Sequence, residues 1–187
     1  MSSHHIVREK QEPALYIHQL GNFDEENLGQ LLEWSPTLIV NASSYEKVIS
    51  LGLKIDIVVN TASGVSFQEN TKSIHVKSDE LTDVLEYLIE EKYPAVNIIS
   101  AESNSLHLKP FFSKINLVVF NETYKSYAVR SGFKIWKPEG TLFQVQTSES
   151  FQFTNMRQID DSEFEVINDG FVEFIFNATY LPISEAL

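Results

Sequence analysis

The sequence predicts an α/β fold, in which a three-layer domain with a parallel sheet is followed by an antiparallel domain that resembles a β-sandwich. Up to about residue 121, short Val/Ile-rich segments alternate with segments of helical period. This alternation is typical of parallel strands joined by crossover helices. Beyond that point the helical period stops, and short apolar segments separated by turn residues follow. We therefore expect an α/β domain over residues 1–121 and a β domain over residues 122–187.

The expected elements of the first domain follow from apolar periods and capping residues. Its strands are Ala14–Leu20, Thr37–Val40, Ile55–Val59, Ser73–Val76, Ala95–Ile99 and Asn116–Phe120. Its helices are Asp24–Trp34, Ser44–Leu51, one that begins after Ser78 or Asp79, and Leu106–Phe112. The third helix is the clearest, because apolar residues from Leu81 to Ile89 recur with a period of roughly 3.6.

The second domain is expected to consist of short strands. They are Tyr124–Val129, Phe133–Trp136, Thr141–Gln146, Phe151–Asn155, Glu163–Ile167 and Phe171–Phe176, and Asn168-Asp169-Gly170 predicts a hairpin between the last two. These strands carry more apolar side chains than one small sandwich face easily buries, including Phe143, Phe151, Phe153, Phe171, Phe174 and Phe176. We therefore expect a homodimer through this domain, with Trp34 and Trp136 in the core or at the domain junction.

Composition excludes several classes of protein. The chain has 187 residues, of which 43% are hydrophobic and 21% charged, so it can bury a core and is not a disordered chain. No apolar run approaches the roughly 18 residues of a membrane helix, and Met1–Lys10 lacks the apolar region of a secretion signal. The absence of cysteine excludes disulfides, thiolate metal sites and a cysteine nucleophile. These features fit a cytoplasmic protein without membrane contact.

The charge of the chain argues against nucleic acid as a partner. The formal net charge is −12. From Pro138 onward there are nine acidic residues and one basic residue, so this region carries 1 − 9 = −8 of the total. An acidic surface of this kind repels a phosphate backbone.

The sequence lacks the common phosphate-binding and hydrolase motifs G-x-x-x-x-G-K-[ST], G-x-G-x-x-G, H-E-x-x-H and G-x-S-x-G. Instead, small polar residues follow several expected strands, where ligands bind in open parallel sheets. The candidate ligand-binding residues are Ser43, Ser44, Asn60, Thr61, Thr82, Glu102 and His107. The alternative is that such loops are polar without binding anything. His18 and His75 lie within expected strands, and we expect them to be structural.

Asp79 and Asp83 are the candidate metal ligands, because carboxylates four residues apart on one helical face could share a Mg²⁺ ion. The competing interpretation is that acids in the first turn of a helix complement its dipole.

The order of elements and several spacings over residues 14–177 resemble the thiamine pyrophosphokinase family, which transfers a pyrophosphoryl group from ATP to thiamine. Gly52 matches the end of a family helix, Ile55-Asp56 a Pro-Asp pair, and Thr82-Asp83 the family's Thr-Asp pair. The segment from Asn168 to Val172 resembles the closing hairpin. The resemblance implies an α/β domain followed by a thiamine-binding β-sandwich, and a homodimer. It implies Mg²⁺ and ATP as cofactors if the protein is active, with Asp83 as the surviving catalytic acid.

Other family motifs are degenerate in this chain. The family's Asp-Gly-Gly turn falls on Ala42-Ser43-Ser44, and its Gly-Asp-Phe-Asp-Ser loop falls on residues 60–64, so carboxylates are missing at Ala42, Thr61 and Ser63. The Gly-Gly-Arg-x-Asp-His loop falls on residues 103–108, which contain neither Arg nor Asp. Because transfer from ATP needs Mg²⁺ and cationic donors, we expect a catalytically silent relative that keeps a crevice for a nucleotide- or thiamine-type ligand. The alternatives are an active thiamine diphosphokinase whose metal site is rebuilt from Asp79, Glu80 and Asp83, and a non-enzymatic dimeric interaction protein.

Overall fold

The computed structural model describes residues 12–60, 67–77, 79–101, 106–147 and 149–187. The chain divides into two compact units. The first comprises the residues up to Ala101 together with Ser113–Leu117, and the second comprises Glu102–Phe112 together with Val118–Leu187. The domain boundary between residues 121 and 122 stays a prediction.

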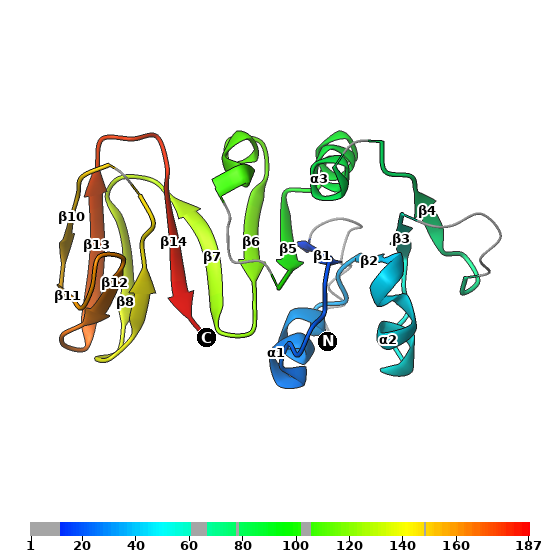
Figure 1. Ribbon diagram of the computed structural model, residues 1–187, viewed down its shortest axis with the longest axis horizontal. Coiled ribbons are helices and arrows are strands. Elements are labelled where there is room, and N and C mark those ends of the chain that lie inside the picture. Colours follow the sequence, from blue (N-terminus) through cyan, green and yellow to red (C-terminus); the bar gives the residue numbers. More distant parts are fainter. Residues whose placement is uncertain (1–11, 61–66, 78, 102–105, 148) are drawn as a thin grey trace, which may run out of the picture. The chain divides into compact units, whose positions relative to one another are not determined.

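Five parallel strands form the sheet of the first unit, in the order β5-β1-β2-β3-β4 (Figure 1). They are β1 Ala14–Ile17, β2 Leu38–Asn41, β3 Ile57–Val59, β4 Lys72–Ile74 and β5 Ala95–Ile99. This arrangement confirms the parallel α/β sheet expected from the sequence. The strand β1 lies between β2 and β5, and the relative exposure of each of its four residues is 0%. Any polar atom on this strand therefore needs a partner inside the protein.

Helices connect these strands. They are α1 Glu25–Leu32, α2 Tyr45–Ser50 and α3 Glu80–Glu90, together with the 3₁₀ helices η1 Ala42–Ser44 and η2 Leu106–Phe111. The side chain of Asp79 accepts a hydrogen bond from the backbone N–H of Thr82 at 2.8 Å, so Asp79 is the N-cap of α3, as expected. The α-helix predicted over 106–112 is instead a 3₁₀ helix that contains Pro110, which lacks the N–H of a regular α-helical turn.

The second unit has two antiparallel sheets, with strand orders β11-β12-β9-β14-β7-β6 and β10-β13-β8. Its strands are β6 Asn116–Phe120, β7 Tyr124–Val129, β8 Phe133–Lys137, β9 Leu142–Gln144, β10 Phe151–Thr154, β11 Met156–Gln158, β12 Glu163–Val166, β13 Gly170–Phe176 and β14 Leu181–Ala186. The division between the units falls within β6. The antiparallel, sandwich-like β region is thus confirmed.

Two details of this region differ from the sequence expectations. The strands β11 and β14 were not predicted, and β14 contains Pro182 and Glu185, which do not suit a typical strand. Pro182 is tolerated because only Ser184 and Glu185 pair with β9, so that Pro182 pairs on one side alone. The predicted hairpin at 168–170 is wrong, because β12 and β13 belong to different sheets and the turn carries the chain from one to the other.

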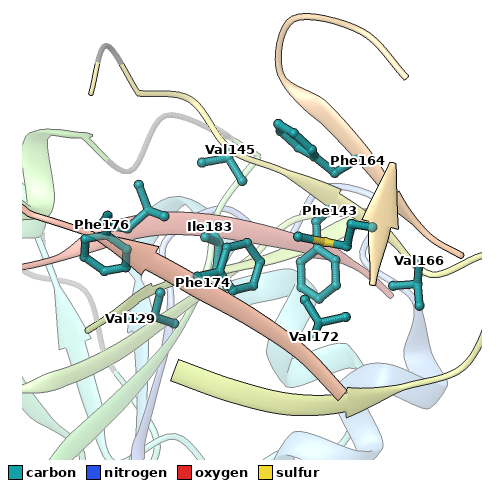
Figure 2. Close-up of a cluster of buried hydrophobic side chains, with 11 residues drawn as sticks. Val129, Phe143, Val145, Phe164, Val166, Val172, Phe174, Phe176 and Ile183 are labelled. Atoms are coloured by element: carbon teal, nitrogen blue, oxygen red, sulfur yellow. The ribbon is translucent and has the colours of Figure 1, made fainter. Parts of the chain in front are cut away.

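Aromatic side chains from both sheets form the core of the second unit (Figure 2). Phe143 of β9 and Phe174 of β13 are fully buried, with ring centroids 5.6 Å apart in an edge-to-face arrangement. The core thus contains most of the phenylalanines that the sequence analysis counted as more than one sandwich face could bury. Phe171 and Trp136 remain 60% and 53% exposed, and Trp34 is 66% exposed. The expectation that these tryptophans lie in the core is therefore wrong, and their placement at a domain junction stays a prediction.

A buried carboxylate joins the two sheets of this unit. Glu185 of β14 is 4% exposed and forms ion pairs with Lys137 of β8 and, at 3.3 Å, with Lys125 of β7. Its other oxygen accepts a hydrogen bond of 3.1 Å from the Tyr127 hydroxyl. Burial raises the pKa of Tyr127 above its ordinary value, and the Glu185 charge raises it further, so the hydroxyl stays protonated and donates. Because β8 and β14 lie in different sheets, the Lys137–Glu185 pair fixes one sheet against the other.

We expect Lys137→Met to lower the free energy of unfolding by about 3 kcal/mol, because it removes a counter-charge of a buried carboxylate. The matched control is Arg157→Gln, which breaks the exposed Arg157–Glu165 pair of the same unit and should cost less than about 1 kcal/mol. Urea denaturation measures both. Equal losses in the two variants would contradict a structural role for the buried pair.

Candidate functional site

Four polar side chains gather in the first unit, where β1 and β2 end and α3 begins. Tyr16 lies in β1, His18 follows that strand, Asn41 ends β2, and Glu80 is the first residue of α3. Because β1 and β2 are parallel neighbours, their carboxyl ends lie at the same edge of the sheet, which is where ligands bind in open α/β sheets.

All four side chains meet at one oxygen atom. Oε1 of Glu80 accepts hydrogen bonds from the Tyr16 hydroxyl and from Nδ2 of Asn41. Nδ1 of His18 lies 2.9 Å from the same oxygen and 3.1 Å from the Tyr16 hydroxyl. We call these residues, Tyr16, His18, Asn41 and Glu80, the strand-end cluster. Three protein groups thus orient the Glu80 carboxylate.

Burial sets the protonation of the tyrosine in this cluster. Tyr16 is fully buried, and Asn41 is nearly so. Burial raises the pKa of Tyr16 far above its ordinary value, and its hydrogen bond to Glu80 raises that pKa further. The hydroxyl therefore stays protonated and serves as a donor. The side chains of His18 and Glu80 are 20% and 15% exposed, so the cluster is open to solvent on their side.

The orientation of the Asn41 amide is fixed by Ser43. Oδ1 of Asn41 accepts hydrogen bonds from the backbone N–H of Ser43 at 2.7 Å and from Oγ of Ser43 at 2.6 Å. Since the oxygen of the amide faces two donors, its nitrogen must face the Glu80 carboxylate. Ser43, a predicted ligand-binding residue, is exposed and directly contacts the strand-end cluster.

The other predicted ligand-binding residues lie at various places. Ser44 is buried, and Asn60 is exposed with a φ of 61° and donates its backbone N–H to the carbonyl of Ile74 at 3.1 Å. Thr82 lies in the first turn of α3. Thr61 and Glu102 fall outside the described residues, and for His107 the structure describes only the backbone, which lies in η2. The ligand-binding roles of these residues stay predictions.

The candidate metal ligands both bond to backbone N–H groups. Asp79 caps α3, and Oδ2 of Asp83 accepts a hydrogen bond from the N–H of Lys77. Within the described ranges, no three His, Asp or Glu side chains gather in a way that could hold a metal ion. A Mg²⁺ ion held by Asp79 and Asp83 stays a prediction, and each carboxylate already has a structural partner.

Sequence reasoning missed most of the strand-end cluster. His18 and Tyr16 belong to an expected strand, and a histidine or tyrosine within a strand is usually structural. The available signal was a tyrosine and a histidine in alternate positions at the carboxyl end of an otherwise apolar strand. That spacing places them on one face of the chain, but it does not show that Glu80, more than sixty residues later, meets both.

Comparison with solved structures identifies the class of fold. The chain is similar to thiamine pyrophosphokinase from Bacillus subtilis, with a TM-score of 0.66 and 11% identity over 92% of this chain and 98% of that one. It is similar to the yeast enzyme, with a TM-score of 0.67 and 8% identity over 97% and 88%. Thiamine pyrophosphokinase from Candida albicans gives a TM-score of 0.59 and 9% identity over 97% and 95%.

The chain therefore has the thiamine pyrophosphokinase fold, which confirms the fold implied by the resemblance in the sequence. No protein-family model matches the sequence, and no curated protein matches it. At such low identities the likeness establishes the fold alone, so any function must be argued from the residues of the site.

We expect Tyr16→Phe to lower the free energy of unfolding by about 2 kcal/mol, because it removes a donor from a partly buried carboxylate. The matched control is Tyr93→Phe, since Tyr93 is also buried and its hydroxyl pairs with the uncharged Thr37 hydroxyl at 2.9 Å. Loss of that neutral bond should cost about 1 kcal/mol. Urea denaturation compares the two, and a larger loss for Tyr93→Phe would contradict a charged role for Glu80.

Proposed function

We propose that this chain is a catalytically silent protein with the thiamine pyrophosphokinase fold, and that it retains a crevice for a small ligand at the carboxyl ends of β1 and β2. The observation that carries the proposal is the state of Glu80. Its oxygen Oε1 is bonded by Tyr16, His18 and Asn41. The oxygen Oε1 of this carboxylate at the sheet edge is thus occupied by protein groups and is not free to coordinate a metal ion.

The chemistry of pyrophosphoryl transfer supports the silent assignment. Mg²⁺ must bridge the phosphates and offset their charge, and donors must stabilise the charge that develops during transfer. In the sequence resemblance, the family's acidic positions fall on Ala42, Thr61 and Ser63. Loss of a single group that stabilises a transition state often costs a factor of about 100 to 1,000 in rate. Several such losses together should leave little activity, although their effects are not additive.

A retained crevice is supported by the polar groups at the same edge of the sheet. Ser43 is exposed beside Asn41, and the cluster is open to solvent at His18 and Glu80. Such groups can bind the polar part of a thiamine- or nucleotide-type ligand without a metal ion. The alternative of an active thiamine diphosphokinase would instead require ATP together with a Mg²⁺ ion held by Asp79, Glu80 and Asp83.

The proposal also covers the cellular location of the protein and its partners. We propose a cytoplasmic protein that binds a small molecule and no nucleic acid, in keeping with its net charge of −12. Among the helices in the described part of the chain, none is both long enough and apolar enough to cross a membrane.

We expect purified protein supplied with ATP, Mg²⁺ and thiamine to form no measurable AMP or thiamine diphosphate. A thermal-melting screen of the same protein against thiamine, its phosphates, AMP and ATP tests the crevice, because a ligand that binds only the native state raises the melting temperature. Turnover of about one per second, abolished by Asp83→Asn, would establish the active alternative. Silence without any ligand-induced stabilisation would favour the non-enzymatic interaction protein.

We also infer that the protein is a homodimer that associates through the outer face of the sheet β10-β13-β8. Phe171 and Trp136 are directly opposite each other on β13 and β8, both are exposed, and Ile175 is exposed on the same face of β13. An exposed cluster of large apolar side chains is typical of an association surface.

Sedimentation at about 50 μM should show a dimer, because a homodimer with a Kd of about 1 μM is mostly associated at that concentration. Trp136→Glu should convert it to a monomer, because a buried unpaired charge opposes association. The matched control, Trp34→Glu, changes a tryptophan of the first unit that is exposed to a still greater extent and should leave the dimer intact. A monomeric wild-type protein would contradict the inference.

A further inference from the structure

The protons of the strand-end cluster can be assigned from the partners of each atom. Tyr16 has one hydroxyl proton, which it donates to Oε1 of Glu80. Its oxygen therefore presents lone pairs to His18, and the Glu80 oxygen is also an acceptor. Nδ1 of His18 lies 3.1 Å from the first and 2.9 Å from the second. Because both neighbours of Nδ1 are acceptors, Nδ1 must carry a proton.

This assignment determines the role of the other ring nitrogen. In a neutral imidazole one nitrogen is a donor and the other an acceptor, so Nε2 of His18 is an acceptor. Among the described residues, Nε2 has no hydrogen-bond partner, and no side-chain nitrogen or oxygen is both buried and without one. Nε2 is therefore accessible to solvent. Since Nδ1 is hydrogen-bonded to Tyr16 and Glu80 inside the cluster, the orientation of the ring is fixed and Nε2 points toward solvent.

The charge of the cluster decides which kind of group can approach. Glu80 is its charged member, because Tyr16 is kept protonated by burial and Asn41 is neutral. Within the described part of the chain, no lysine or arginine forms an ion pair with Glu80. The residues before Pro138, to which the cluster belongs, carry a net charge of −12 − (−8) = −4. This field attracts cations to the sheet edge and repels phosphate groups.

We propose that the strand-end cluster binds a small organic cation that donates an N–H group to Nε2 of His18, with Glu80 as the residue that positions the imidazole and supplies the attracting charge. This rests on the proposed crevice and names its ligand class: an amine or another nitrogen cation with N–H donors, not a phosphate ester. Tyr16 and Asn41 act through Glu80, because their hydrogen bonds prevent that carboxylate from turning away from His18. No metal ion is needed for this mode of binding.

Nitrogen NMR of the ¹⁵N-labelled full chain tests the proton assignment and the ligand class together. At about pH 8, where histidine is ordinarily neutral, His18 should show the tautomer with its proton on Nδ1. Addition of ethanolamine or benzylamine should shift the Nε2 resonance to saturation. Their trimethylated counterparts, choline and benzyltrimethylammonium, carry the same charge without N–H donors. They should bind about tenfold more weakly, the factor expected for one lost hydrogen bond.

A pair of variants separates a specific site from general attraction to an acidic protein. His18→Leu should abolish amine binding measured by calorimetry, whereas His75→Leu, which changes an exposed histidine of the same unit, should leave it unchanged. Circular dichroism melting confirms that both variants fold. If His18→Leu does not fold, the NMR titration of the unaltered protein decides the question.

Several results would overturn the proposal. These are a proton on Nε2 of free His18, no shift with either amine, equal affinity for the trimethylated cations, a saturating Nε2 shift with inorganic phosphate or AMP, or amine binding that survives in folded His18→Leu. The thiamine assay tests the proposed function separately from the NMR experiment. Formation of thiamine diphosphate would refute the silent enzyme but would not change the His18 resonances of the free protein.

Discussion

The burial of β1 is the constraint on which the first unit depends. This strand lies between β2 and β5, and all its side chains are removed from solvent. A tyrosine on such a strand must find a partner for its hydroxyl inside the protein. The partner is Glu80 at the start of α3, so satisfying Tyr16 fixes that helix end against the sheet. The orientations of His18 and Asn41 follow from the same carboxylate.

Each unit thus holds a partly or fully buried carboxylate, but the two are neutralised in different ways. Glu185 in the second unit meets two lysines and the Tyr127 hydroxyl, so its charge is offset by the protein. Glu80 meets a tyrosine, an asparagine and a histidine at its oxygen Oε1, and no lysine or arginine of the described residues forms an ion pair with it. The first arrangement holds two sheets together. The second leaves a net negative site at the edge of a sheet where ligands commonly bind.

The environment of the Glu80 carboxylate bears on the comparison with thiamine pyrophosphokinases. A shared fold places the carboxyl ends of the parallel strands at one edge of the sheet but does not specify the chemistry of that edge. An enzyme that handles ATP must gather metal ions and cationic donors at that edge. In this chain the edge carries the Glu80 carboxylate, the His18 imidazole and the hydroxyl of Ser43. Our proposal of a ligand that donates N–H groups, and not one that carries phosphates, rests on these groups.

The sequence by itself determined the α/β and β regions and the α3 helix with a cap at Ser78 or Asp79, because periodicity and capping are local properties of the chain. It did not determine that Asn168-Asp169-Gly170 joins two sheets, since a turn does not specify which strands pair beyond it. Nor did it place Tyr16 and His18 beside Glu80. Only the tertiary structure decided that contact, because the pairing of parallel strands and the docking of α3 bring together residues whose separation in sequence carries no signal of contact.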